Sequence, residues 1–110
     1  MSLPSLTEWL IQVPVIPGSF EKRVSLRQQH FNEAIPKIRD GIITFAGGIL
    51  PEPTLDGDNK DMTMTIITVN AETEAEARKI VEEDVYSSQG VWDISKMQIF
   101  AFKTGIRAPK

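Results

Sequence analysis

The sequence has no cysteine and only one histidine, His30, among its 110 residues. The missing cysteines exclude disulfide bonds and thiolate sites, because both require that side chain. A single histidine argues against a transition-metal site, since imidazole and thiolate are the ligands such metals favour. We therefore expect a site whose chemistry needs neither a metal nor another cofactor.

Long hydrophobic runs and a surplus of positive charge are missing as well. The apolar run over residues 9–13 is too short to span a membrane, and Glu8 precedes it where a signal peptide would carry positive charge. The net charge is −3, whereas nucleic-acid binding calls for a clustered surplus of Lys and Arg. We expect a soluble cytoplasmic protein whose main partner is neither nucleic acid nor a membrane.

The spacing of the apolar residues predicts one domain over residues 1–110, with the order β-α-β-β-α-β. Two helical crossovers that obey the right-handed rule would place both helices on one face of a four-stranded antiparallel sheet. This is an α+β, ferredoxin-like fold. The predicted strands cover residues 7–13, 42–50, 61–69 and 91–103, and the predicted helices cover residues 26–40 and 73–84.

The same spacing predicts which residues are buried. On the first helix the apolar face consists of Phe31, Ala34, Ile35 and Ile38, and on the second strand Ile43, Phe45 and Ile49 share one face. The sheet face without helices would carry a mixed set that includes Leu10, Thr44, Ala46 and Leu50. A sheet face of this kind usually finds a partner, so we predict a homodimer packed sheet to sheet.

The stretch of residues 21–30 contains the candidate reactive groups. Ser25 followed by Gln28 is a capping-box pattern, which predicts a helix start at Leu26 and places His30 about one turn inside. Backbone N–H groups and the helix dipole would then favour a bound anion, with Arg23 and Arg27 as bidentate partners. The alternative is that both arginines form solvated ion pairs with Glu21 or Glu33, and that His30 is a core-edge residue.

The chemistry that these groups could perform is proton transfer. A helix N-terminus disfavours the imidazolium ion, so a neutral His30 could accept a proton while an arginine holds an anionic oxygen of the substrate. This arrangement suits isomerisation or elimination. The pair Gly47 and Gly48 follows a strand start rather than opening a helix, so it is not a nucleotide site. It indicates room for a close approach to the backbone by a ligand or by the partner sheet.

Four short segments carry a family resemblance. Residues 19–30 resemble the Arg-x-x-His signature of the YCII-related family, whose small α/β proteins are related in fold to muconolactone isomerase. The glycine pair at 47–48, the segment Asp84-Val85-Tyr86 with Gly90-Val91 after it, and residues 98–103 resemble later family segments in the right order. Val85 stands where the family usually has proline.

The resemblance implies a dimeric α/β barrel in which Asp84 orients and polarises His30 and Tyr86 lies at the substrate. It also implies a small acidic substrate such as a lactone, a hydroxylated aromatic compound or an enolisable acid. The alternatives are a non-catalytic dimeric module that binds a similar small molecule, and a purely structural interaction protein. From their residue types alone, Tyr86 and Trp92 are more typical of core or interface aromatics than of substrate platforms.

The predicted pair of Asp84 and His30 poses a geometric problem. In the plain β-α-β-β-α-β layout both helices start at the same end of the sheet, so the start of the first helix and the end of the second should lie apart. A helix bent at Pro36, the loop over residues 14–24 or a second subunit could close the gap, and we favour the second subunit. We predict that the two side chains lie within about 6 Å of each other in the assembled dimer.

Overall fold

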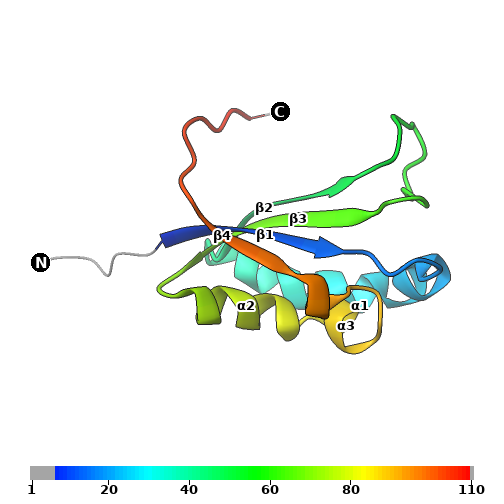
Figure 1. Cartoon of the computed structure of the whole chain (residues 1–110), viewed down its shortest axis with the longest axis horizontal. Coiled ribbons are helices and arrows are strands. Elements are labelled where there is room, and N and C mark those ends of the chain that lie inside the picture. The colour runs from blue at the N-terminus through cyan, green and yellow to red at the C-terminus, as the bar shows by residue number, and fades with distance from the viewer. Residues whose placement is uncertain (1–6, 110) are drawn as a thin grey trace, which may run out of the picture.

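The computed structural model describes residues 7–109, and so leaves out seven residues of the predicted domain 1–110. Figure 1 shows its elements in chain order. They are β1 (Thr7–Pro14), α1 (Phe20–Arg39), β2 (Ile43–Ile49), β3 (Met64–Ala71), α2 (Glu74–Glu82), the one-turn helix α3 (Val85–Ser88), the 3₁₀-helix η1 (Ile94–Lys96) and β4 (Gln98–Phe102).

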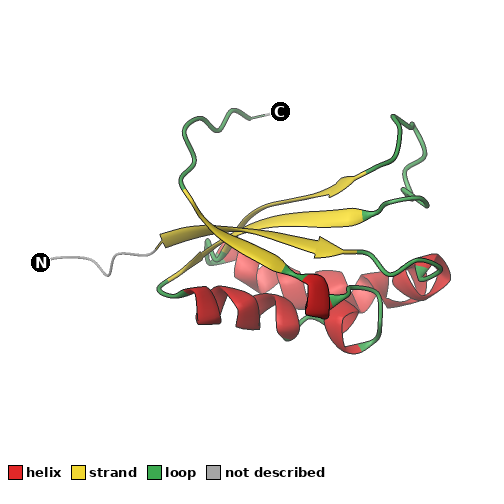
Figure 2. Ribbon diagram, viewed as in Figure 1, coloured by secondary structure: helices red, strands yellow, loops and turns green. Residues whose placement is uncertain are grey.

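The four strands form one antiparallel sheet in the order β2-β3-β1-β4. Both long helices lie on the same face of this sheet (Figure 2). The predicted ferredoxin-like α+β fold is therefore confirmed. β4 is shorter than predicted, because Trp92 bridges to Val15 and the 3₁₀ turn η1 follows before β4 begins.

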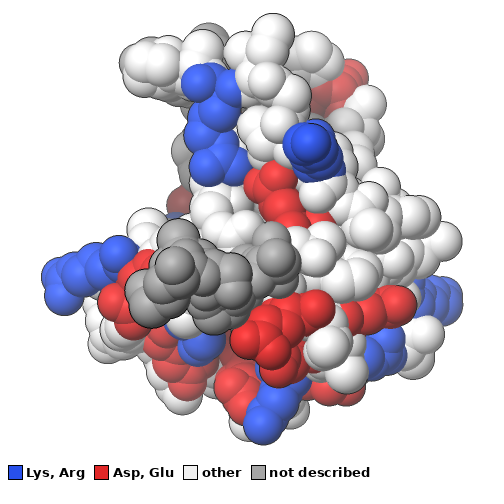
Figure 3. Space-filling view, turned by 90° about the vertical axis from the view of Figure 1, so that its left-hand side faces the viewer, with Lys and Arg blue, Asp and Glu red and all other residues white. Residues whose placement is uncertain are grey.

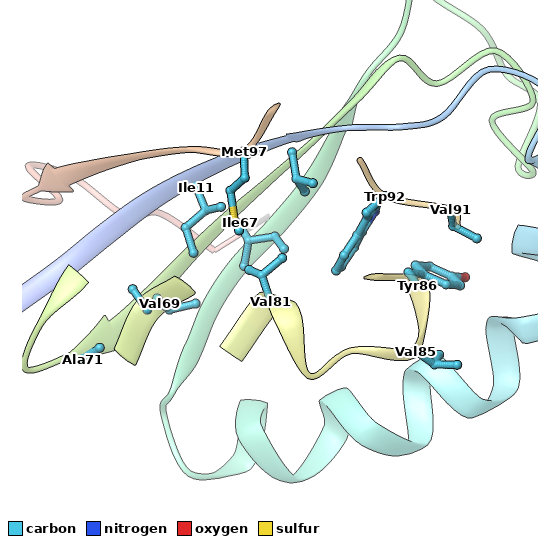
Figure 4. Close-up of a cluster of buried hydrophobic side chains, with 12 residues drawn as sticks. Ile11, Ile67, Val69, Ala71, Val81, Val85, Tyr86, Val91, Trp92 and Met97 are labelled. Atoms are coloured by element: carbon cyan, nitrogen blue, oxygen red, sulfur yellow. The ribbon is translucent and has the colours of Figure 1, made fainter. Parts of the chain in front are cut away.

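The hydrophobic core fills the space between the sheet and the helices (Figure 4). Its fully buried side chains come from β1, β3, α2 and the segment after α3, and they include Ile11, Val13, Val69, Val81 and Val91. Alternate residues of β1 and β3 supply these contacts, as a half-buried strand requires. The core is thus continuous with the aromatic residues that follow α3.

Helix α1 begins at Phe20 rather than at the predicted Leu26. The turn at Pro17-Gly18, where Gly18 has φ +80°, makes Ser19 the N-cap residue. Ser25 lies inside the helix, and its hydroxyl donates a hydrogen bond to the Lys22 carbonyl at 2.8 Å. The capping-box prediction was wrong because the upstream turn starts the helix first and the helical bonds then extend through Ser25.

The buried face of α1 is narrower than predicted. Of the four residues expected on it, only Ala34 is buried, whereas Phe31, Ile35 and Ile38 are 49, 41 and 54% exposed. On α2 the apolar spacing predicts a buried stripe of Ala75, Ala77, Ile80 and Val81. Ala77 and Val81 are buried and Ile80 packs against the core, but Ala75 is exposed.

A register shift between Ile43 and Phe45 divides β2 into two parts. Ile43 pairs with Val69 and packs against the core, but beyond the shift Ala46 pairs with Ile67 on the helix-covered face. Phe45 therefore points to the helix-free face, where it is 55% exposed. The sequence predicted that Ile43, Phe45 and Ile49 share one face and that Ala46 lies on the helix-free face. Both predictions were wrong, because the bulge reverses the alternation of side chains beyond Ile43.

Helix α2 begins as predicted, since the Thr73 hydroxyl accepts a hydrogen bond from the Glu76 N–H at 3.2 Å. Glu74 and Glu76 lie in its first turn, where negative charge is favourable.

Acidic and basic side chains lie intermingled on the end of the molecule shown in Figure 3. Of the helices within residues 7–109, none has the length and apolar character needed to cross a membrane.

We expect the core to depend on Ile11, which is fully buried on β1. The substitution Ile11→Ala should lower the free energy of unfolding by roughly 2–5 kcal/mol, since it leaves a cavity in a packed core. The matched control is Ile106→Ala, at a position 92% exposed, where we expect a change within about 0.5 kcal/mol. Urea unfolding followed by tryptophan fluorescence measures both, and equal losses would contradict the described core.

Candidate functional site

The sequence predicted that Asp84 ends the second helix. In the structure Asp84 is instead the N-cap residue of α3. Its carboxylate Oδ1 accepts a hydrogen bond from the Tyr86 N–H at 2.8 Å. An aspartate in this position satisfies a backbone donor that the short helix would otherwise leave unpaired. This hydrogen bond fixes the position of the Asp84 carboxylate between α2 and α3.

The imidazole of His30 meets this carboxylate directly. Nδ1 lies 2.8 Å from both Oδ1 and Oδ2 of Asp84. The His30 side chain is 18% exposed and that of Asp84 is 12% exposed. The predicted proximity of the two residues is confirmed within one chain, so a second subunit is not needed to bring them together.

The earlier start of α1 removes the geometric problem. His30 lies near the middle of the 20-residue helix rather than in its first turn, and α1 packs against α3. This position also removes the argument that a helix N-terminus keeps His30 neutral, because the dipole acts mainly within the terminal turns. What governs the imidazole is its contact with Asp84.

The contact with Asp84 determines which nitrogen of His30 can react. An ionised carboxylate can only accept hydrogen bonds, so Nδ1 must carry the hydrogen. In the neutral ring Nε2 then has a free lone pair, and within residues 7–109 it has no hydrogen-bond partner. An imidazole held in this way can accept a proton at Nε2 while the carboxylate stabilises the resulting positive charge.

Two aromatic rings fix the plane of the imidazole. Tyr86 stacks on His30 with the ring centroids 4.0 Å apart and the planes 9° from parallel, and Trp92 meets His30 edge-on at 5.6 Å. Tyr86 donates its hydroxyl hydrogen to the Arg23 carbonyl at 3.2 Å, and the Trp92 indole N–H donates to Thr65 at 3.1 Å. Both rings are buried parts of the core (Figure 4).

Glu33 is a further residue of the site that the sequence did not single out. Its Oε1 accepts a hydrogen bond from the Val85 N–H at 2.9 Å, which ties α1 to the start of α3 one turn beyond His30. A proline at position 85 would lack this donor. Only the spacing of Glu33 from His30 on one helix face could have indicated it.

The two arginines reach the loop between β2 and β3, residues 50–63, and not the acidic residues of α1 that the alternative named. Arg23 is 8% exposed, and its Nη2 donates to the carbonyl oxygens of Asp58 and Asn59 at 3.0 and 2.7 Å. Arg27 forms an ion pair with the Asp58 carboxylate, Nη1 to Oδ1, at 3.2 Å.

Two cavities meet at His30. The larger one, about 380 Å³, has mixed walls whose polar groups include those of Arg27, Asp58 and Tyr86. The smaller one, about 120 Å³, is apolar and is lined by residues such as Phe31, Ile38, Ile43, Ala46, Ile80 and Trp92, with Asp84 beside His30. A small ring bearing oxygen atoms could therefore place its polar groups on one side of His30 and an apolar substituent on the other.

The absence of a side chain at Gly48 leaves room for the side chain of Met62. A Cβ atom at this position would collide with the side chain of Met62, which lines the larger cavity. At Gly48 the close approach is therefore made by the Met62 side chain, and not by the ligand or the partner sheet that the sequence had suggested. Among residues 7–109, no group of three or more His, Asp or Glu side chains gathers as a metal site would require.

Known proteins resemble this chain in fold and in sequence. A crystal structure of 5-chloro-2-hydroxyhydroquinone dehydrochlorinase (TftG) from Burkholderia phenoliruptrix, in complex with 2,5-dihydroxybenzoquinone, superposes with a TM-score of 0.74. It is 26% identical, and the match covers 89% of this chain and 95% of that one. The fold is thus similar to the dimeric α/β barrel fold of that enzyme.

The sequence relatives are fungal biosynthesis proteins. Fusaric acid biosynthesis protein 2 of Gibberella fujikuroi is 31% identical over 99 residues, covering 90% of this chain and 95% of that protein. Aspartate kinase FUB3 of Fusarium oxysporum f. sp. lycopersici is 33% identical over 98 residues, or 89% of this chain, but the match covers only 18% of the kinase. The kinase activity in that name is therefore not carried over. No protein-family model matches the chain.

Tyr86 is the only tyrosine of the sequence, so its titration can be followed alone. Burial raises the pKa of the Tyr86 phenol above its ordinary value, and this outweighs the opposite effect of the nearby Arg27 and Arg23. Between the ordinary pKa of about 10 and the raised one, the folded protein keeps a proton that the unfolded chain has lost. We expect stability to fall as the pH rises through this window.

Absorbance at 295 nm, which reports tyrosinate, measures the titration, and Tyr86→Phe should abolish the signal in the folded protein. A midpoint at or below that of free tyrosine would show that the phenol is not held in the buried environment described above.

Proposed function

Because this chain belongs to the family of fusaric acid biosynthesis protein 2 from Gibberella fujikuroi, we propose that it is a small-molecule enzyme of biosynthesis. In this proposal His30 acts as a general base in an isomerisation or an elimination. The substrate is a small anionic or phenolic compound, and no cofactor takes part.

The observation that supports this proposal above the others is the contact of His30 Nδ1 with both carboxylate oxygens of Asp84 at 2.8 Å. Such a contact fixes the tautomer and the ring orientation that a general base requires. A histidine that served only the core would not need its second nitrogen free beside a cavity of about 380 Å³ that Arg27 and Asp58 line.

The reaction begins when Nε2 takes a proton from a substrate O–H or C–H group. The electron pair left behind moves into the conjugated system of the substrate, and the negative charge gathers on an oxygen that Arg27 can hold. The imidazolium ion is stabilised by Asp84, which remains ionised. In an isomerisation the proton returns at another carbon. In an elimination the pair left behind forms a new double bond, and a leaving group departs with the electron pair of its own bond to carbon.

The proposed substrate class follows from the cavity and from the relatives. A phenol or enol presents an acidic proton to Nε2 and an oxygen to Arg27, while an apolar substituent of the ring suits the smaller, apolar cavity. The structural relative is named for a chlorinated hydroxyhydroquinone and holds a dihydroxybenzoquinone. A hydroxylated aromatic ring or its quinone is therefore the first class to test.

We expect His30→Asn and Asp84→Asn each to lower the turnover of such a substrate by about 10²-fold or more. The melting temperature should stay within a few degrees for Asp84→Asn, because asparagine is an equally good N-cap residue. The assay follows loss of ring-hydroxylated compounds, beginning with 5-chloro-2-hydroxyhydroquinone, by absorbance and by proton exchange with D₂O.

The matched control is Asp93→Asn. Asp93 also caps a short helical segment, with its carboxylate accepting from the Ser95 N–H, but it lines neither cavity at His30. Its substitution should leave turnover unchanged. Tight binding of the compounds without turnover by the wild type would favour the alternative, a non-catalytic binding module. Full activity of His30→Asn would contradict the general-base role.

We further propose a homodimer formed through the helix-free face of the sheet. Exposed aromatic side chains gather there, with Phe45, Phe100 and Phe102 at 55, 47 and 39% exposure. Figure 1 shows the C-terminal segment rising from this side, and the Glu8 carboxylate holds it by accepting hydrogen bonds from Thr104. An apolar face of this extent is covered in most proteins, and a second copy covers it by two-fold symmetry.

We expect the wild type to sediment as a dimer of two 12.3 kDa chains at micromolar concentration. Phe45→Asp should shift it toward monomer by placing a charge in the interface. The control Val24→Asp introduces the same charge at an exposed position of α1 and should remain dimeric. Sedimentation velocity measures both, and a monomeric wild type would contradict the proposed dimer.

A further inference from the structure

The β2–β3 loop, residues 50–63, forms one wall of the larger cavity at His30. Figure 1 shows this loop at the same end of the molecule as the start of α1. Its Gly57, Asp58, Asn59 and Met62 face the cavity, whereas the remaining walls come from α1, β3 and the residues around α3. The loop is thus the one wall that is not built from helices, strands or their short connections.

Arg23 is the fixed anchor of this loop. Its guanidinium is buried and donates from Nη2 to two successive backbone carbonyls, those of Asp58 and Asn59. Charge-assisted hydrogen bonds of this kind are stronger when they are shielded from water. Backbone acceptors do not depend on a side chain, so this contact persists whatever the Asp58 carboxylate does.

The loop also holds itself together without the Asp58 carboxylate. Asp56 accepts from the Asp58 N–H at 3.1 Å through its side chain, and from the Asn59 N–H at 3.3 Å through its carbonyl. The Met62 N–H in turn donates to the Asn59 carbonyl at 3.1 Å. Movement of the Asp58 side chain alone would therefore leave the loop in place.

The ion pair between Arg27 and Asp58 is of a different kind. Its two side chains are 32 and 58% exposed, and a single contact of 3.2 Å joins them. Exposed pairs of this kind contribute little and are easily exchanged. Asp58 is nevertheless the only acidic side chain on the loop wall of the cavity, and Arg27 is the arginine whose side chain is not committed to backbone carbonyls.

We infer that Asp58 is a specificity-determining residue of this site. Its carboxylate is an internal counter-ion of Arg27, and an anionic oxygen of the ligand competes with it for the guanidinium. This inference rests on the proposed function, because it concerns ligands of the His30 site. Binding exchanges an internal ion pair for one with the ligand, so Asp58 weakens the binding of anions. Neutral ligands do not compete for Arg27, so their binding does not carry this cost.

The exchange can be tested with 2,5-dihydroxybenzoquinone as the probe, titrated calorimetrically at low ionic strength, about 20 mM, where screening is weak. Asp58→Asn keeps the shape of the side chain but removes its charge, and it should tighten binding about two- to fivefold, the range that an exposed pair allows. In an Arg27→Gln background the same substitution should change binding by less than about 1.5-fold, because the competition is gone.

The charge-matched control is Asp61→Asn. Asp61 lies on the same loop and is exposed, but it does not line the cavity at His30. Equal tightening by Asp61→Asn would overturn the inference, since it would reveal a general effect of loop charge. Weaker binding by Asp58→Asn would also overturn it, because Asp58 would then assist the ligand.

The absence of probe binding by the wild type would count against the proposed function, and urea unfolding then decides whether the ion pair exists. If Asp58 and Arg27 act on each other, Asp58→Asn and Arg27→Gln should lower the urea midpoint by the same amount, and the double variant should lower it no further. Additive effects would overturn the pairing itself.

Discussion

The contact between His30 and Asp84 links α1 to α3 and orients the imidazole. One carboxylate caps α3, accepts from the Tyr86 N–H and receives the imidazole of α1. Glu33 reinforces the same junction by accepting from the Val85 N–H. Because each group satisfies a donor that would otherwise be buried without a partner, the position of His30 follows from the hydrogen-bonding needs of the α1–α3 junction. The reactive group is therefore oriented by the fold itself.

The two arginines that stand four residues apart on α1 have separate roles. Arg23 is buried and donates hydrogen bonds to the backbone of the β2–β3 loop, whereas Arg27 is partly exposed and pairs with the Asp58 side chain of that loop. Burial explains the difference, since a shielded guanidinium with backbone partners is fixed and a solvated one can exchange its partner. On α1, Arg23 thus holds the loop that forms one wall of the cavity, and Arg27 supplies a positive charge that can exchange its partner.

The sheet separates the candidate site from the proposed interface. His30, Tyr86 and Trp92 lie on the helix-covered side, while Phe45, Phe100 and Phe102 lie on the other. The register shift in β2 turns Phe45 to the helix-free face, so it adds an aromatic ring to that surface and places the smaller Ala46 beside the core. A change in pairing by one residue therefore shapes both sides of the sheet.

The family resemblance indicated Asp84 as the partner of His30. The sequence by itself determined the order of the elements and the antiparallel ferredoxin-like sheet. Apolar periodicity and turn residues carry that information because they act over a few neighbours along the chain. The bulge in β2, the partners of Arg23 and the contact between His30 and Asp84 were decided only by the tertiary structure. Each depends on contacts between segments far apart in sequence, such as Arg23 with Asp58 and His30 with Asp84, and local spacing carries no measure of such distances.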